Sequence, residues 1–251
     1  MSWEIAPLSE RIMTIIGRYK NGGNVAKEAF SLLKEVLEPY HENHDMTYRY
    51  EHTLRVAVKG QQIADGEGWD REPLMIACLL HDIGYPECKT PDDFNHHQDI
   101  SAEIAKVFLR NIEYDGKSAQ SICRAIAFHA RTSIVPDDAT AFELSVRDAD
   151  DLDGYDIMRT YIRGSMIIGV NGNWMCGGHN AAQIINGCRE QLKQIENAQH
   201  RVCGTKTAQR LWDEQLLLRK NYYEALLNQM QTTEDMEQDL MSMEQGLMSR
   251  G

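Results

Sequence analysis

Residues 74–86 read Leu-Met-Ile-Ala-Cys-Leu-Leu-His-Asp-Ile-Gly-Tyr-Pro, an apolar run that closes on a histidine and an aspartate. Such a run predicts a buried helix, and Gly84 and Pro86 predict its end. His81 and Asp82 are poor core residues, because a buried imidazole and a buried carboxylate must both be desolvated and partnered. The pair instead suits a divalent metal, since imidazole nitrogen and carboxylate oxygen are ligands of several such ions.

A second histidine and an acidic motif flank this pair along the chain. His52 lies upstream in Tyr-Arg-Tyr-Glu-His-Thr-Leu-Arg-Val, and Asp150 lies downstream in residues 147–154, Arg-Asp-Ala-Asp-Asp-Leu-Asp-Gly. The order His…His-Asp…Asp resembles that of the HD-domain metal-dependent phosphohydrolases. Residues 97–105, His-Gln-Asp-Ile-Ser-Ala-Glu-Ile-Ala, are similar to the middle of that family, and the closing motif is similar to that of its small bacterial members. The resemblance covers roughly residues 45–230.

The resemblance implies an all-α protein, an HD-domain helical bundle that holds a metal at its centre. Bundles bind metals through side chains that project inward from several helices. The ligands that the resemblance implies are His52, His81, Asp82 and Asp150. Asp148 and Asp151 lie close to Asp150 and are alternatives to it. We favour Asp150, with Asp148 as a hydrogen-bond partner beside the site.

Two further histidines, His97 and His129, lie between the His-Asp pair and the last aspartate. In dinuclear members of the family such histidines bind a second metal. The alternative for His97 and His129 is that they contact substrate phosphate and transfer protons near neutral pH, beside a single metal. We expect one divalent metal per chain (Mn, Fe, Co, Ni, Zn or Mg), with two as the alternative. His97 and His129 then join His81 and Asp82 as catalytic residues, whereas His96 points to another helix face.

Arginines are the natural ligands of phosphate, because a guanidinium donates two parallel hydrogen bonds to it. Arg55 lies three residues after His52, so both share one face of a helix. It is therefore the first candidate for a substrate-binding residue. Arg131, Arg147 and Lys89 are weaker candidates from their places beside the other motifs.

The pattern is helical nearly throughout, with almost no alternating β-branched runs. The predicted helices cover residues 3–19, 24–38, 47–65, 70–82, 96–112, 117–130, 139–163, 180–197 and 205–230. Residues 1–230 are expected to form one domain, with its core at about 45–160 and flanking helices at 1–40 and 180–230. Residues 231–251 form an acidic, Met-rich tail that we expect to be mobile.

Composition limits the partners of the protein. The 251 residues carry a formal net charge of −12, which argues against an extended nucleic-acid surface. No apolar run approaches the roughly 20 residues that span a membrane, and the N-terminus lacks a secretory pattern. Six scattered cysteines are typical of free thiols in a reducing cytoplasm, where we expect the protein. A homodimer through the terminal helices is a further expectation.

The predicted function is hydrolysis of a phosphate ester or anhydride of a small molecule, with a nucleotide as the favoured substrate. A bound divalent metal lowers the pKa of water and polarises a phosphoryl oxygen, which is the chemistry that such a reaction needs. Two alternatives stay open: an HD-type di-iron oxygenase, which also uses the additional histidines, and a non-catalytic nucleotide-binding regulatory module.

Overall fold

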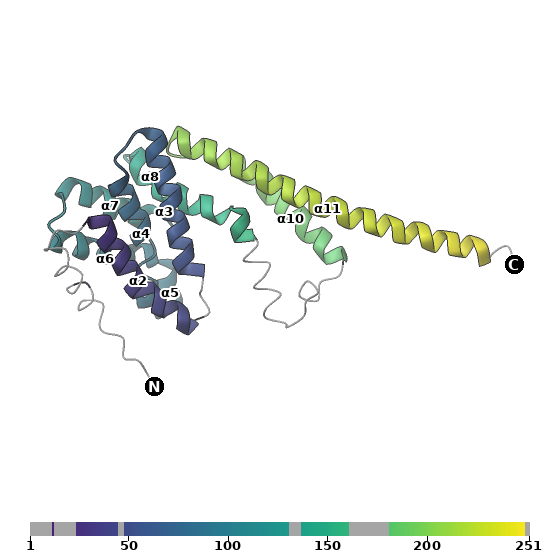
Figure 1. Cartoon of the computed structure of the whole chain (residues 1–251), viewed down its shortest axis with the longest axis horizontal. Coiled ribbons are helices and arrows are strands. Elements are labelled where there is room, and N and C mark those ends of the chain that lie inside the picture. Colours follow the sequence, from purple (N-terminus) through teal and green to yellow (C-terminus); the bar gives the residue numbers. More distant parts are fainter. Residues whose placement is uncertain (1–11, 13–23, 45–47, 131–136, 161–180, 249–251) are drawn as a thin grey trace. The chain divides into compact units, whose positions relative to one another are not determined.

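The structure, a computed structural model, describes residues 12, 24–44, 48–130, 137–160 and 181–248 (Figure 1). Within this part of the chain every regular element is a helix, so the all-α prediction is confirmed. The chain separates into two compact units. The first comprises residues 1–154 and 203–211, and the second comprises residues 155–202 and 212–251. The single domain predicted for residues 1–230 stays a prediction.

The first unit is a helical bundle built around one short apolar helix, α4. Its described helices are α2 (Val25–His44), α3 (Tyr48–Glu67), α4 (Arg71–Leu80), the 3-10 helix η1 (Tyr85–Glu87), α5 (Pro91–Asn95), α6 (His97–Asn111), α7 (Gly116–Phe128) and α8 (Ala141–Gly154). Helices α2, α3, α7 and α8 all pack against α4. Leu74, Ile76 and Leu80 of α4 are fully buried, and this burial is the main favourable term in folding. The apolar run therefore forms the centre of the bundle.

Local sequence signals place the helix starts. Asp70 caps α4, because its side chain accepts a hydrogen bond from the backbone N–H of Glu72 at 3.0 Å. Asp115 caps α7 in the same way, through the N–H of Ser118 at 2.9 Å. These two caps fix where the loops before α4 and α7 end.

Three predicted helix boundaries are wrong. Helix α2 continues through Pro39 to His44, although an interior proline removes one backbone hydrogen bond and crowds the preceding turn. The helix predicted over 139–163 is interrupted after Gly154, where Asp156 accepts a hydrogen bond from the N–H of Met158 at 3.0 Å and starts a new turn. The last helix, α11 (Lys206–Met248), continues through most of the predicted tail. The helix predicted over 3–19 lies almost wholly outside the described residues.

The second unit contains α10 (Ala181–Ala198) and α11 from Trp212 onward. Trp212 is buried, and its indole N–H donates to the carbonyl of Ala198 at 3.1 Å. Arg219 is also buried and donates to the side chain of Gln191 at 2.7 Å. These contacts join the first third of α11 to α10.

Residues 203–211 belong to the first unit although they follow the long intervening segment. The N–H of Gly204 donates to Asp148 on α8 at 2.7 Å, and the N–H of Thr207 donates to Glu67 on α3 at 2.9 Å. This returning segment thus contacts two helices that carry candidate site residues, at the end of α3 and in the middle of α8. None of the helices in the described ranges is long and apolar enough to cross a membrane.

Candidate metal centre

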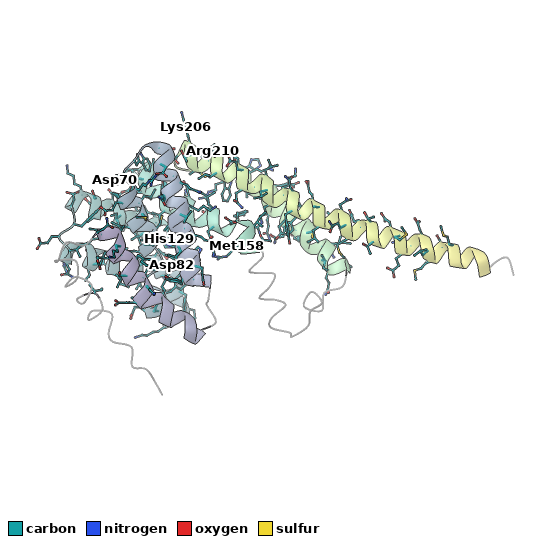
Figure 2. The ribbon with its side chains drawn as sticks, viewed as in Figure 1. Asp70, Asp82, His129, Met158, Lys206 and Arg210 are labelled. Atoms are coloured by element: carbon teal, nitrogen blue, oxygen red, sulfur yellow. The ribbon has the colours of Figure 1, made fainter. Side chains whose placement is uncertain are left out.

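Histidine and aspartate side chains from five separate segments converge inside the first unit. His52 comes from α3, His81 and Asp82 follow α4, His97 opens α6, His129 follows α7, and Asp150 lies on α8. Side chains of His52, His81, Asp82 and His129 are almost completely buried, and Figure 2 labels Asp82 and His129 among these helices. Four buried titratable groups in one place require partners, and here they are each other's neighbours.

The carboxylate of Asp82 lies between two pairs of histidines. Its Oδ2 is 3.7 Å from Nε2 of His52 and 3.5 Å from Nε2 of His81. Its Oδ1 is 3.4 Å from Nε2 of His97 and 3.4 Å from Nε2 of His129. Asp150 joins the first pair, because its Oδ1 is 3.2 Å from Nε2 of His52.

Asp82 therefore divides the centre into two sides. We call the group of His52, His81 and Asp150 the His52 side, and the pair His97 and His129 the His97 side. The three potential ligand atoms on the His52 side lie within 4.8 Å of one another. On the His97 side the two Nε2 atoms are 3.3 Å apart. Each side thus offers atoms close enough to hold one ion together with an oxygen of Asp82.

In each of the four histidines, Nε2 faces the centre and Nδ1 contacts an oxygen atom of another residue. Nδ1 of His81 lies 2.7 Å from the carbonyl oxygen of Cys78, and Nδ1 of His129 lies 2.7 Å from that of Ile126. Nδ1 of His97 lies 2.8 Å from the carbonyl oxygen of Phe94. A carbonyl only accepts, so these Nδ1 atoms donate, and in the neutral ring the lone pair is left on Nε2, which faces Asp82.

On the His52 side a carboxylate replaces the carbonyl. Nδ1 of His52 lies 2.6 Å from Oδ2 of Asp153, which is itself fully buried. A carboxylate behind a histidine fixes the ring and makes its free nitrogen a better metal ligand. The sequence analysis did not assign a role to Asp153, although it lies three residues after Asp150 and therefore on the same face of α8.

The chemistry of these donors fits a divalent metal. Nε2 of His81 is buried and makes no hydrogen bond. Leaving such an atom unsatisfied costs about 1–3 kcal/mol, so native structures rarely do so without a reason. A metal ion beside Asp82 would satisfy it, and the fixed Nδ1 contacts already orient the ring for that purpose.

Charges in the centre depend strongly on one another. Burial disfavours the charged form of His52, but hydrogen bonds to Asp150 and Asp153 outweigh it and raise the pKa of His52 from 6.5 to about 9. Burial lowers the pKa of His81 to about 4 and also lowers the pKa of His97. Burial would raise the pKa of Asp150, but the hydrogen bond to His52 outweighs that effect and holds the pKa of this carboxyl well below its usual range.

The predicted phosphate ligand Arg55 contacts Asp153. Its Nε is 2.5 Å from Oδ1 and its Nη2 is 3.3 Å from Oδ2 of that carboxylate. Arg55 thus binds Asp153, and Asp153 binds His52, which belongs to the centre. The guanidinium of Arg55 is therefore linked to the centre through one carboxylate. The predicted contact of Arg55 with substrate stays a prediction.

A second arginine, which the sequence analysis missed, reaches the centre directly. Nη1 of Arg49 donates to Oδ2 of Asp82 at 2.7 Å, and its guanidinium lies 3.8 Å from the ring centre of Tyr85. The ring of Tyr85 lies 4.4 Å from that of His97. Arg49 precedes His52 by three residues, so the helical spacing that pointed to Arg55 applies to it equally.

Other predicted residues lie outside this cluster or outside the described ranges. Arg131 belongs to the segment that the structure does not describe. Lys89 is exposed, and its backbone N–H donates to Asp93 at 2.9 Å. Arg147 is half-buried on α8 with no described contact to the centre. Asp148 is buried and accepts from Gly204, so it is a hydrogen-bond partner beside the site. His96 is exposed, as predicted.

Gly84 explains how His97 comes so close to Asp82. A Cβ atom at this position would lie 2.8 Å from the backbone nitrogen of Ser101 and 2.9 Å from the carbonyl oxygen of His97. Only a glycine lets the first turn of α6 pack so closely against the turn after Asp82. The N–H of Gly84 also donates to Oγ of Ser101 at 2.9 Å. Glycine at this point therefore positions the His97 side.

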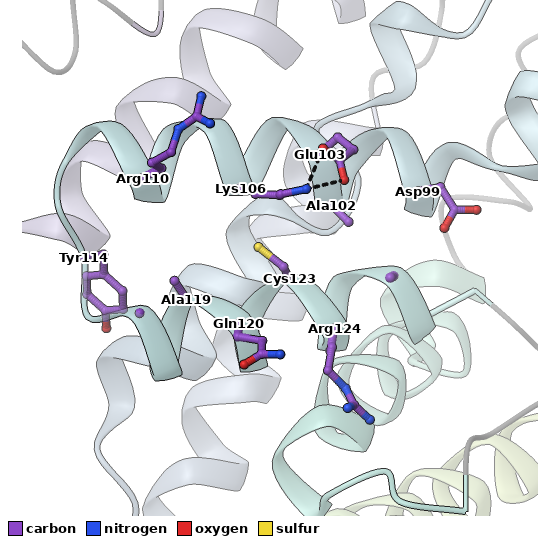
Figure 3. Close-up of a pocket in the computed structure, with 12 residues that line it drawn as sticks. Asp99, Ala102, Glu103, Lys106, Arg110, Tyr114, Ala119, Gln120, Cys123 and Arg124 are labelled. Atoms are coloured by element: carbon purple, nitrogen blue, oxygen red, sulfur yellow. Dashed lines mark hydrogen bonds and ion pairs between the residues drawn. The ribbon is translucent and has the colours of Figure 1, made fainter.

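A separate cavity of about 630 Å³ lies between α6 and α7 (Figure 3). Small side chains, among them Ala102 and Ala119, line it, and Lys106 pairs with Glu103 along its wall at 3.0 Å. Its lining includes none of the metal-site or substrate-binding residues predicted above. The buried cluster, where histidines and aspartates converge, remains the candidate site.

Comparison with known families agrees with this geometry. Residues 49–158 match the family model described as HD domain, and this range contains all six residues that converge in the centre. This segment of the chain is an HD domain, so the resemblance found in the sequence is confirmed. Proteins of this superfamily are mostly metal-dependent phosphohydrolases that bind divalent metals. No curated protein and no solved structure matches the chain.

Proposed function

We propose that the protein is a metal-dependent phosphohydrolase that cleaves a phosphate ester or anhydride of a small molecule, with a nucleotide as the favoured substrate. One observation carries the proposal: four histidines hold their Nδ1 atoms on fixed partners and direct Nε2 toward the single carboxylate of Asp82. Of these, Nε2 of His81 is buried without a hydrogen bond. That arrangement is costly unless an ion binds there.

The His52 side together with Asp82 would hold the first metal. A divalent ion at this position supplies a Lewis acid for the phosphoryl oxygen and lowers the pKa of a bound water. Asp153 and the carbonyl of Cys78 keep His52 and His81 in the orientation that binding requires. Arg49 places a positive charge beside Asp82, where it can attract an anionic substrate.

The number of metals is two in this proposal, although the sequence favoured one. Each oxygen of Asp82 faces a different pair of histidines, at 3.4 to 3.7 Å. Asp82 would then help to hold both ions, one beside each pair of histidines. His97 and His129 would then complete the second site, and with one metal they would instead contact the phosphate and transfer a proton to the leaving group.

The same donor set favours one second candidate, an HD-type di-iron oxygenase. Its support is the His97 side, since histidines beyond the first four ligands are what that reading requires. Oxygen uptake that depends on both iron and an organic substrate would favour it. Phosphate release with manganese, cobalt or nickel in place of iron would favour the hydrolase.

The first experiment is elemental analysis of the purified full chain, followed by phosphate release from a panel of nucleotides. We expect about two divalent ions per chain, and we expect His81→Ala to lose both bound metal and turnover while keeping its helical circular dichroism. His96→Ala is the matched control, because this neighbouring histidine is exposed. Full hydrolysis by folded, metal-free His81→Ala protein would contradict the proposal.

A further inference from the structure

The part of α11 from Tyr222 to Met243 carries an exposed apolar stripe. Tyr222, Met236, Leu240 and Met243 expose 43%, 59%, 59% and 65% of their surface. Every side chain that the structure describes from Thr232 to Met243 is exposed. Figure 1 shows this part of α11 as one continuous helix.

The spacing of the stripe is that of a coiled coil. Beginning at Tyr222, positions separated by alternating steps of four and three residues are Tyr222, Leu226, Gln229, Thr233, Met236, Leu240 and Met243. One further step of four reaches Leu247 in the sequence. Repeats of seven sustained over three turns of the pattern indicate a seam that packs against another helix, and an isolated helix with such a seam is only marginally stable in water.

We propose that the seam pairs with the same seam of a second copy of this chain, in antiparallel orientation. The pattern is self-complementary in one register, in which Leu226 meets Met243 of the partner and Gln229 meets Leu240. In that register Thr233 meets Met236 across the two-fold axis. Every seam position then faces another seam position, and the two polar members lie near the middle, where they fix the register.

Charge selects the antiparallel orientation. Residues 234–239 contain four acidic side chains and no basic one. A parallel pair would place these two acidic stretches at the same level, with Glu237 and Asp239 beside the seam on both helices. The antiparallel register instead places residues 234–239 level with residues 230–235 of the partner, so the acidic stretches overlap only at Glu234 and Asp235. Glu237 then lies level with Thr232, and Asp239 lies level with Met230 of the partner. Antiparallel helices also oppose their dipoles favourably.

Sedimentation of the full chain tests the pairing. We expect a dimer for the native chain and a monomer, with half the apparent mass, for Leu240→Glu. Gln238→Glu is the matched control, because it adds the same charge on the side of α11 away from the seam and is expected to stay dimeric. A native monomer, or a dimer that survives Leu240→Glu, would overturn the proposal.

Cysteine pairing tests the orientation. Leu226→Cys and Met243→Cys chains, mixed and oxidised, should give an intermolecular disulfide between residues 226 and 243 that mass spectrometry identifies. Disulfides between like residues in each chain alone would show a parallel pair and overturn the antiparallel register. Metal content and turnover are measured on the same samples. Because they report on the other unit, failure of the pairing and failure of the proposed hydrolase are separately visible.

Discussion

The two sides of the metal centre are built differently. On the His52 side, Nδ1 of His52 contacts the buried carboxylate of Asp153, which in turn binds Arg55. On the His97 side, the Nδ1 atoms of His97 and His129 contact backbone carbonyl oxygens. A carboxylate raises the basicity of the histidine that it holds more than a carbonyl does. The two sides should therefore differ in metal affinity. We expect the His52 side to bind its ion more tightly and to fill first.

Removing the carboxylate of Asp153 should have the largest effect on the difference in metal affinity between the two sides. We expect Asp153→Asn to weaken metal binding on the His52 side by roughly 10- to 100-fold, since partners behind a ligand have effects of that size. Titration of dialysed protein with manganese measures it. Asp137→Asn, an exposed position, serves as the control. Equal affinities in the two variants would remove the distinction between the sides.

A change at Gly84 should disturb the weaker side. Because a new Cβ would press on the backbone of His97 and Ser101, we expect Gly84→Ala to lower the free energy of unfolding by about 1–3 kcal/mol. The second ion should be lost before the first. Gly116→Ala is the control, because open space surrounds that position and alanine is the better helix former by about 1 kcal/mol. Thermal unfolding and metal content, measured together, test both statements.

The smallest effect concerns pH. The pKa of His52 in the folded chain, about 9, lies above its ordinary value of 6.5. Its contribution to stability is therefore complete below pH 6.5 and is lost as the pH rises through 9. In chelator-treated protein we expect the unfolding midpoint to fall across that window, and His52→Ala should remove the fall. Metal-loaded protein should not show it, because a ligand histidine is already deprotonated.

Part of the centre could be predicted because His81, His97 and His129 lie at helix ends. The apolar run of α4 stops at Gly84 and Pro86, so the positions of His81 and Asp82 follow from the sequence alone. The roles of Arg49 and Arg55 could not be separated in this way. Both lie three residues from His52 on one helix face, and only the packing of α8 decides that Asp153 takes Arg55.

Features that depend on packing between distant parts of the chain could not be predicted from local sequence signals either. A proline ends many helices, yet α2 continues through Pro39, and the packing of α2 on α4 offsets the roughly 3 kcal/mol that an interior proline costs. The heptad positions of α11 are spaced in the sequence as they are in the structure. That Tyr222, Met236, Leu240 and Met243 are exposed, and so available to a second chain, is a property that only the structure shows.

The return of residues 203–211 to the first unit bears on how the protein is made. The HD match ends at residue 158, but Asp148 and Glu67 obtain their partners from Gly204 and Thr207. During synthesis these partners emerge from the ribosome only after some forty further residues. The first unit therefore lacks these two hydrogen-bond donors until a much later segment has been translated. Residues 49–158 expressed alone would leave Asp148 and Glu67 without these partners.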